Sequence, residues 1–328
     1  MRWILRMIGR LILILVLAGV LVYVFGPTED TTLDTDFDPS TLGADLDAYF
    51  GGAEAAVSDI TPGVEKRVVW AGDANTKTDL AILYVHGFSA TSQEIHPVPD
   101  RVADALGANL IYTRLQGHGR TSPDAMADGT VTGWMRDLAE GLAAARQAGD
   151  EVIVMSTSTG GTLVTAALDV SGMLESVTGT IFVSPNYGLN TGLEPLLTAP
   201  AARYWLPLLA GDRRSFEPKN EEHGTYWTTE YPSVAVLPMA AIVKKVREMD
   251  VSGTTIPALF AYSPDDQVVR PDITQRLMGD WGAATTHFDP GPMGPNDDPQ
   301  AHVIAGDIMS PGKTDATVEA MLTWINGL

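Results

Sequence analysis

The stretch that decides the fold is 151–161, which reads EVIVMSTSTGG. Its first five residues form an apolar run typical of a buried β-strand, and small residues follow it at once. A sharp strand-to-helix turn can lift a serine hydroxyl above a sheet only if the residues two before and two after it are small, because the backbone there approaches its neighbours closely. Ser158 meets this condition with Ser156 before it and Gly160 after it, whereas Ser156 fails because Val154 precedes it. We therefore predict a nucleophile turn at Ser158, entered from a strand and left by a helix.

Strands and helices alternate on both sides of this turn. Strands are predicted at 66–70, 80–85, 109–115, 180–183, 256–262 and 285–288, and helices at 97–106, 131–148, 162–168 and 314–326. Such alternation is typical of an α/β fold, in which a mostly parallel central sheet is covered by helices on both faces.

One interval, 187–250, interrupts the alternation. It has no clear strand pattern and is rich in proline and aromatic residues, among them Tyr204, Trp205 and Trp227. An insert of this kind between two sheet strands indicates a cap over the strand ends. The alternative is a helical pair that only packs against the domain.

The N-terminus has the pattern of a membrane anchor. Arg2, Arg6 and Arg10 precede LILILVLAGVLVYVF, fifteen residues without a charge. Residues 1–26 are predicted to be an uncleaved signal anchor with one transmembrane helix; a cleaved signal peptide and a buried helix are the alternatives. The positive-inside rule places the N-terminus in the cytoplasm. The catalytic domain is then extracytoplasmic, and periplasmic if the membrane is the inner membrane of a Gram-negative cell.

Composition and charge narrow the possible functions. The net charge of −20 argues against nucleic-acid binding, which needs an excess of Lys and Arg. The chain contains no cysteine, which excludes thiol catalysis and disulfides. No metal-binding or cofactor-binding motif is present, so we expect neither a metal nor a cofactor. Residues 27–59 hold nine acids and no Lys or Arg, so 27–60 is predicted to be an acidic linker before the main domain at 61–328.

Further residues complete a catalytic constellation around Ser158. Gly87 allows the backbone to turn so that the N–H of Phe88 can face the site, and the N–H of Thr159 begins the helix after Ser158. Two such donors can hold the oxyanion of a tetrahedral intermediate. Asp265 or Asp266 follows the strand 256–262, and either carboxylate could orient a histidine.

The histidine predicted to act as the base is His302, which lies before the last helix. The resulting chain order of Ser, Asp and His is typical of this fold class.

These features resemble the α/β-hydrolase superfamily, and within it bacterial carboxylesterases and monoacylglycerol lipases. The matching pieces are VHGF at 85–88, RLQGHGR at 114–120, Trp134 with Asp137, STSTGG at 156–161, SPDDQVV at 263–269 and AHVIAG at 301–306. The resemblance implies a triad of Ser158, Asp266 and His302, with Phe88 and Thr159 as oxyanion donors. It favours Asp266 over Asp265. The chain departs from the family pattern at Ser156, where glycine is usual.

The function expected on this basis is a membrane-anchored serine hydrolase that cleaves small-molecule carboxylic esters. The first alternative is an amidase or aminopeptidase on the same triad, for which Glu221 and Glu222 of the cap could provide an acidic pocket. The second alternative is a catalytically silent binding module tethered to the membrane.

Overall fold

The computed structural model describes residues 2–328, and its centre is a mostly parallel β-sheet. Within these residues seven strands follow the order β1-β3-β2-β4-β5-β8-β9, with β1 antiparallel to β3 at one edge. The other neighbouring pairs are parallel. The strands are β1 (Arg67–Val69), β2 (Thr78–Val85), β3 (Asn109–Tyr112), β4 (Gly149–Thr157), β5 (Val177–Val183), β8 (Ala258–Ala261) and β9 (Thr285–Phe288). All seven predicted sheet strands are present, including the one that leads to Ser158, which confirms the α/β fold class.

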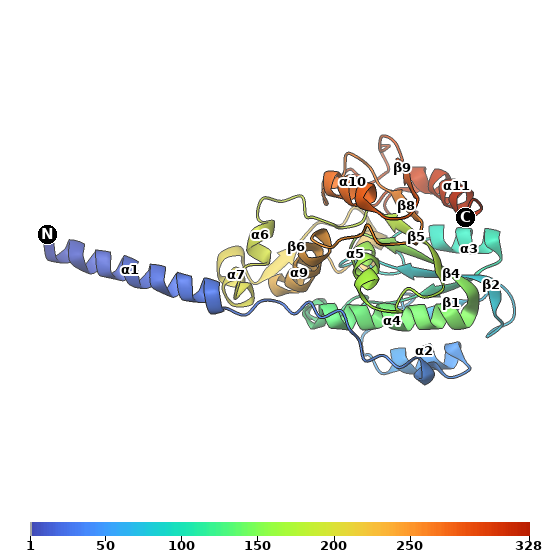
Figure 1. The fold of residues 1–328 in the computed structure, drawn as a ribbon, viewed down its shortest axis with the longest axis horizontal. Coiled ribbons are helices and arrows are strands. Elements are labelled where there is room, and N and C mark those ends of the chain that lie inside the picture. The colour runs from blue at the N-terminus through green and yellow to red at the C-terminus, as the bar shows by residue number, and fades with distance from the viewer. Residues whose placement is uncertain (1) are drawn as a thin grey trace.

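The two faces of the sheet have separate hydrophobic cores, because successive side chains of a strand point to opposite faces. Along β2, Leu83 and Val85 belong to one core, whereas Ile82 and Tyr84 belong to the other. Helices α4 (Val131–Ala148), α5 (Thr159–Ala166) and α9 (Val236–Arg247) cover the first face, and α10 (Pro271–Asp280) contributes to the same core. Helices α3 (Val98–Leu106) and α11 (Thr314–Ile325) cover the second face (Figure 1).

The interval predicted as a cap folds between β5 and β8. It contains α6 (Glu194–Leu197), α7 (Ala202–Ala210), β6 (Arg213–Ser215), α8 (Glu221–Tyr226) and β7 (Glu230–Pro232), and it ends with α9. The expectation of no strand is wrong in one detail, because β6 and β7 form a short antiparallel pair. The insert touches the loop after β2, where the N–H of Thr228 donates to the carbonyl of Ser89 at 2.8 Å.

The N-terminal helix α1 (Arg2–Phe25) projects away from the rest of the molecule (Figure 1). Its most apolar 18-residue window has a mean hydropathy of 2.6, and none of that window is buried. By length and composition α1 could cross a membrane, although a signal sequence has the same properties. The first residue of the predicted anchor, Met1, lies outside the described residues.

The acidic segment 27–60 is not a free linker along its whole length. The segment contains a helix, α2 (Leu46–Ala55). Leu42, Leu46 and Phe50 are buried in the same core as α4. The phenol of Tyr49 donates to Glu140 on α4 at 2.7 Å. The second part of the segment therefore packs as a layer outside α4, with Asp45 and Asp47 exposed to water and Glu54 buried.

Candidate active site

Ser158 occupies a sharp turn between β4 and α5. Its backbone φ is +50°, which is uncommon for a residue with a Cβ and fits a strained nucleophile turn. A Cβ at Gly160 would collide with the backbone carbonyl of Val85, so only glycine fits there. Ser156 is buried, and its hydroxyl donates to the carbonyl of Ile181 at 3.2 Å. This hydrogen bond accommodates the serine that stands where the family usually has glycine.

The structure brings Ser158, His302 and Asp266 into one hydrogen-bonded chain. The Oγ of Ser158 lies 3.1 Å from Nε2 of His302, and Nδ1 of His302 lies 2.8 Å from Oδ2 of Asp266. The three side chains come from the loops after β4, β9 and β8. Since these strands are parallel, their carboxyl ends meet at the same edge of the sheet. All three residues are buried, whereas Asp265, the competing acid, is exposed.

Backbone donors fix the carboxylate of Asp266. Its Oδ1 accepts hydrogen bonds from the N–H groups of Val268 at 2.8 Å and Val269 at 2.9 Å. With Oδ1 occupied in this way, Oδ2 is left to accept from Nδ1 of His302. The imidazole is therefore held with its proton on Nδ1, and Nε2 is free to take the proton of Ser158.

A second carboxylate, Asp298, holds the loop that carries the histidine, and the sequence did not reveal it. Its Oδ2 accepts from the N–H groups of His302 at 3.1 Å and Val303 at 2.9 Å. Burial by itself lowers the pKa of His302. Asp266 overcomes this effect, with smaller contributions from Asp298 and Glu94, and the pKa of His302 is raised. These carboxylates favour the protonated form of the imidazole.

The predicted oxyanion donors lie beside the nucleophile. Thr159 is the first residue of α5, so its N–H has no acceptor within the helix. The N–H of Phe88 makes no hydrogen bond to the backbone of residues 2–328. The ring of Phe88 makes edge contacts with His118 and Tyr231, each at a centroid distance of 5.5 Å, and with Trp134 at 6.3 Å. This aromatic packing orients the peptide that carries the Phe88 N–H.

Glu94 is a further buried carboxyl next to the site that the sequence did not reveal. Its Oε2 accepts from the N–H of Gly87 at 2.6 Å, and it lies within 3.4 Å of the hydroxyl of Tyr84. Burial raises the pKa of Glu94 to about 7, against the lowering effects of the Gly87 hydrogen bond and of His302. Glu94 thus fixes the backbone one residue before Phe88.

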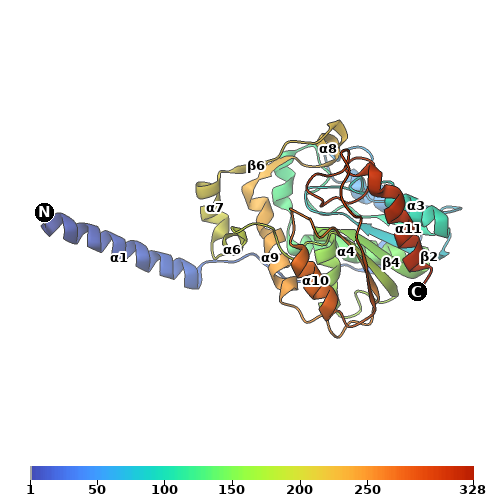
Figure 2. The ribbon, with the colours of Figure 1, turned by 90° about the horizontal axis from the view of Figure 1, so that it is seen from above.

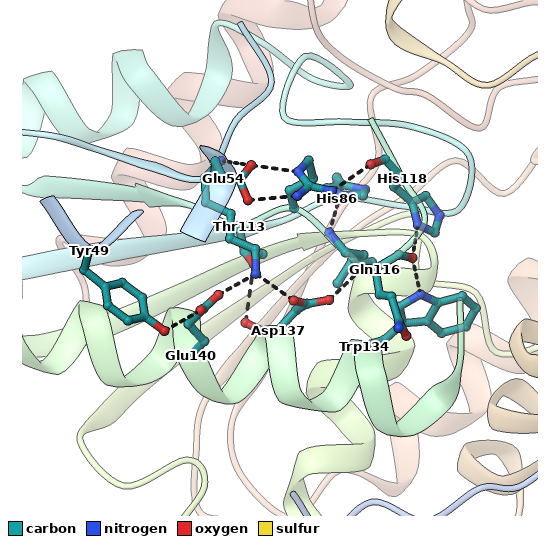
Figure 3. Close-up of polar contacts among 12 residues, drawn as sticks. Tyr49, Glu54, His86, Thr113, Gln116, His118, Trp134, Asp137 and Glu140 are labelled. Atoms are coloured by element: carbon teal, nitrogen blue, oxygen red, sulfur yellow. Dashed lines mark hydrogen bonds and ion pairs between the residues drawn. The ribbon is translucent and has the colours of Figure 1, made fainter. Parts of the chain in front are cut away.

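The loop RLQGHGR at 114–120 is clamped onto α4 (Figure 3). Trp134 donates from Nε1 to the carbonyl of Gln116 at 2.9 Å, and Asp137 accepts from the N–H of Gln116 at 2.6 Å. His86 accepts from the N–H of Leu115 at 3.1 Å, and burial lowers its pKa to about 3, so this imidazole is neutral. Trp134 and Asp137 therefore shape the loop rather than the chemistry.

A buried charged network lies next to this loop. Lys66 pairs with Asp137 at 2.7 Å and with Glu140, and Arg114 donates twice to Glu54, each time at 2.8 Å. Figure 3 shows Tyr49 and Glu140 at one end of this network and His118 and Trp134 at the other. The network ties α2 and the strand β1 to α4.

The two carboxylates that the sequence offered for an amidase pocket lie on the insert. Glu221 and Glu222 are exposed in the first turn of α8. Within residues 2–328, no three side chains of His, Asp or Glu are grouped so as to hold a metal ion.

The chain belongs to the alpha/beta hydrolase family, whose sequence model matches residues 82–304. The matched range begins in β2 and includes every residue of the constellation described above. A comparison with curated proteins found no match.

Solved structures of lipolytic enzymes have a similar fold. One comes from a study of LipS and LipT, two metagenome-derived lipolytic enzymes, and is 20% identical with a TM-score of 0.64 over 82% of this chain and 100% of that chain. A soluble variant of monoglyceride lipase from Saccharomyces cerevisiae is 13% identical, with a TM-score of 0.58 over 83% of this chain and 97% of that chain. The monoacylglycerol lipase of Paleococcus ferrophilus is 12% identical, with a TM-score of 0.54 over 79% and 98%. At these identities the similarity establishes the fold.

Proposed function

We propose that the protein is a membrane-anchored serine hydrolase that cleaves carboxylic esters through an acyl-enzyme on Ser158. The observation that carries the proposal is the hydrogen-bonded chain from Ser158 through His302 to Asp266, buried at the carboxyl edge of the sheet. An ester is favoured over other acyl compounds because the similar structures include lipolytic enzymes and monoacylglycerol lipases.

The proposed reaction uses the hydrogen-bonded chain of the site. Nε2 of His302 takes the hydroxyl proton as Oγ of Ser158 attacks the ester carbonyl. The N–H groups of Phe88 and Thr159 donate to the oxyanion that forms. When the tetrahedral intermediate collapses, the C–O bond to the alcohol breaks, and the imidazolium gives its proton to the alcohol. A water molecule then attacks the acyl-enzyme by the same route, which releases the acid and restores Ser158.

The anchoring half of the proposal rests on α1. We propose that the chain is a single-pass protein of the inner membrane, with its N-terminus in the cytoplasm and its catalytic domain in the periplasm. The supporting observations are the three arginines before the apolar run and the unburied apolar surface of α1. Expression in a bacterial host tests it by fractionation, spheroplast proteolysis and intact mass. A catalytic domain that spheroplasts protect from added protease would contradict this orientation.

The catalytic half is tested with the full chain in detergent. Nitrophenyl esters of graded acyl length are compared with aminoacyl amides, and Ser158→Ala is compared with Ser156→Ala as the matched control. We expect ester hydrolysis to fall by several orders of magnitude in Ser158→Ala only, and a fluorophosphonate probe to label Ser158. Labelling of Ser156 would contradict the assignment, and hydrolysis of amides alone would favour the amidase. No turnover and no labelling would favour the binding module.

A further inference from the structure

The insert carries a patch of exposed apolar side chains. Between residues 193 and 216, which we call the cap tip, six large hydrophobic residues are exposed: Leu193, Leu196, Tyr204, Leu208, Leu209 and Phe216. In the described chain beyond α1, the other large hydrophobic residues that are exposed are Val69 and Leu328. Leu208 and Leu209, at the end of α7, are 82% and 79% exposed. Five of the six lie on or beside the neighbouring helices α6 and α7, and so many large apolar side chains on adjacent surface elements indicate an interaction site.

The cap tip is joined directly to the end of α1. The N–H of Ala201 donates to the carbonyl of Pro27 at 2.6 Å. Arg203, in the first turn of α7, makes a two-point ion pair with Glu29, with N–O distances of 2.9 Å and 2.7 Å. Figures 1 and 2 agree that α6 and α7 are the elements of the domain nearest to the point where α1 leaves it. A membrane that holds α1 therefore has its surface next to α7.

The charge of the insert suits a lipid surface better than the charge of the remaining domain. Residues 187–250 hold seven basic and eight acidic residues, whereas the rest of 27–328 holds 11 basic and 33 acidic residues. The acidic body would be repelled by anionic headgroups, and the nearly neutral insert would not. Tyr204 and the basic side chain of Arg214 are of the types that favour the headgroup region, whereas Arg203 and Arg213 already form ion pairs within the chain.

We propose that the cap tip docks on the bilayer that holds α1, with Tyr204, Leu208 and Leu209 in its interfacial layer. This inference rests on the proposed membrane anchoring and deepens the proposed function, because it orients the insert, which touches the site loop at Ser89, toward a source of lipid esters. The occupant is lipid rather than α1 folded back, because the contacts at Pro27 and Glu29 fix the root of α1 and the 24-residue helix has the length that a bilayer core requires.

The absence of cysteine makes a direct test possible. Leu208→Cys in the full chain is labelled with the environment-sensitive dye NBD and reconstituted in vesicles of phosphatidylcholine and phosphatidylglycerol. The matched control is Leu328→Cys, at the exposed C-terminus, which lies away from α1 in both views. We expect the dye at 208 to be blue-shifted, and quenched severalfold more by lipids with a shallow nitroxide than by aqueous iodide. At 328 the preference is expected to be reversed.

A functional readout complements the spectroscopic one. The double variant Leu208→Gln, Leu209→Gln should hydrolyse a lipid ester presented in vesicles severalfold more slowly than the unmodified chain, and a soluble short-chain ester at an unchanged rate. Equal loss on both substrates would indicate damage to the fold and would contradict the docking role of these side chains.

The outcomes separate this inference from the proposed function. Resistance of the protein to alkaline extraction reports on the anchor, and hydrolysis of the soluble ester reports on the triad. If both hold and the dye at 208 is quenched by iodide, the docking inference is wrong and the proposed function stands. A blue shift without lipid quenching overturns docking, because the dye is then covered by protein rather than by lipid. A shift that disappears when the protein is diluted in lipid indicates a second copy of the chain, and a shift that persists indicates α1. A protein that alkali extracts overturns both docking and the anchor.

Discussion

Replacing Asp266 with asparagine should reverse the tautomer of His302, moving its ring proton from Nδ1 to Nε2. The N–H groups of Val268 and Val269 both point at Oδ1 of Asp266. In Asp266→Asn the amide oxygen can satisfy both donors, whereas an NH₂ group in that place would face two N–H groups. The asparagine oxygen should therefore take the Oδ1 position and turn its NH₂ toward Nδ1 of His302. That nitrogen must then be the acceptor, and the proton moves to Nε2, where it blocks proton transfer from Ser158.

The expected loss can be estimated from the same geometry. An Asp-to-Asn change that fixes the wrong histidine tautomer costs about 10⁴-fold in kcat in serine proteases. That factor corresponds to about 5 kcal/mol of activation free energy, at about 1.36 kcal/mol for each tenfold change. The fold should be retained, because the asparagine keeps the two backbone hydrogen bonds. Asp265→Asn should change kcat by less than about twofold, because that carboxylate is exposed and outside the chain of contacts.

The assay is steady-state hydrolysis of a soluble short-chain ester by both variants, with thermal unfolding as the control for folding. A variant Asp266→Asn that keeps more than a few per cent of the activity would refute the tautomer argument. If Asp265→Asn is the inactive variant, the acid at this turn is misassigned.

Three further perturbations follow from the contacts of the site. Gly160→Ala should lower stability by about 1–3 kcal/mol and greatly reduce activity, because its Cβ would meet the carbonyls of Val85 and His86. The control is Gly253→Ala, whose Cβ would have open space around it. Equal melting temperatures of the two variants would contradict the clash. Glu94→Gln should move the acidic limb of the kcat/KM profile to lower pH, because the ionised Glu94 raises the pKa of His302. The neutral amide removes that effect and can still accept the hydrogen bond from Gly87. An acidic limb that stays in place would show that the carboxylate does not influence His302. Lys66→Met should destabilise the fold by about 3–5 kcal/mol in chemical denaturation, because it leaves Asp137 and Glu140 buried without a cation. The control is Lys77→Met, which removes an exposed ion pair and should lower stability by less than about 1 kcal/mol. Equal losses in the two lysine variants would contradict the argument from burial.

The main sheet could be predicted because its signals are local. Continuous apolar runs such as that of β2 identify buried parallel strands, and the small residues around Ser158 identify the turn. The positions of Asp266 and His302 relative to Ser158 follow from chain order, since parallel strands end at one edge of the sheet. The choice between Asp265 and Asp266 depended on the resemblance to a family, and the structure places Asp266 against His302.

The parts that could not be predicted depend on contacts between distant segments. Glu94 and Asp298 have the residue type of a solvated loop, yet both are buried. Glu94 bonds to Gly87 and Tyr84, and Asp298 bonds to the backbone of His302 and Val303. The helix α10 was not predicted, because its sequence PDITQRLMGD contains few apolar residues and buries only three side chains. The segment 27–60 was predicted to be a linker because its few apolar residues lie among acids. The surface of α4 that buries Leu42, Leu46 and Phe50 comes from a distant part of the chain.

The insert makes two contacts that belong to separate parts of the molecule. At one end Ala201 and Arg203 are bonded to the chain that leaves α1, and at the other Thr228 and Tyr231 touch Ser89 and Phe88. The triad, in contrast, is built only from loops of the central sheet. Changes in the insert should therefore alter how the Phe88 N–H is presented and which ester reaches it, while the chain from Ser158 to Asp266 stays intact. On the proposed function, we therefore expect the insert to govern access to the site and the Phe88 donor, and the loops of the sheet to govern the triad.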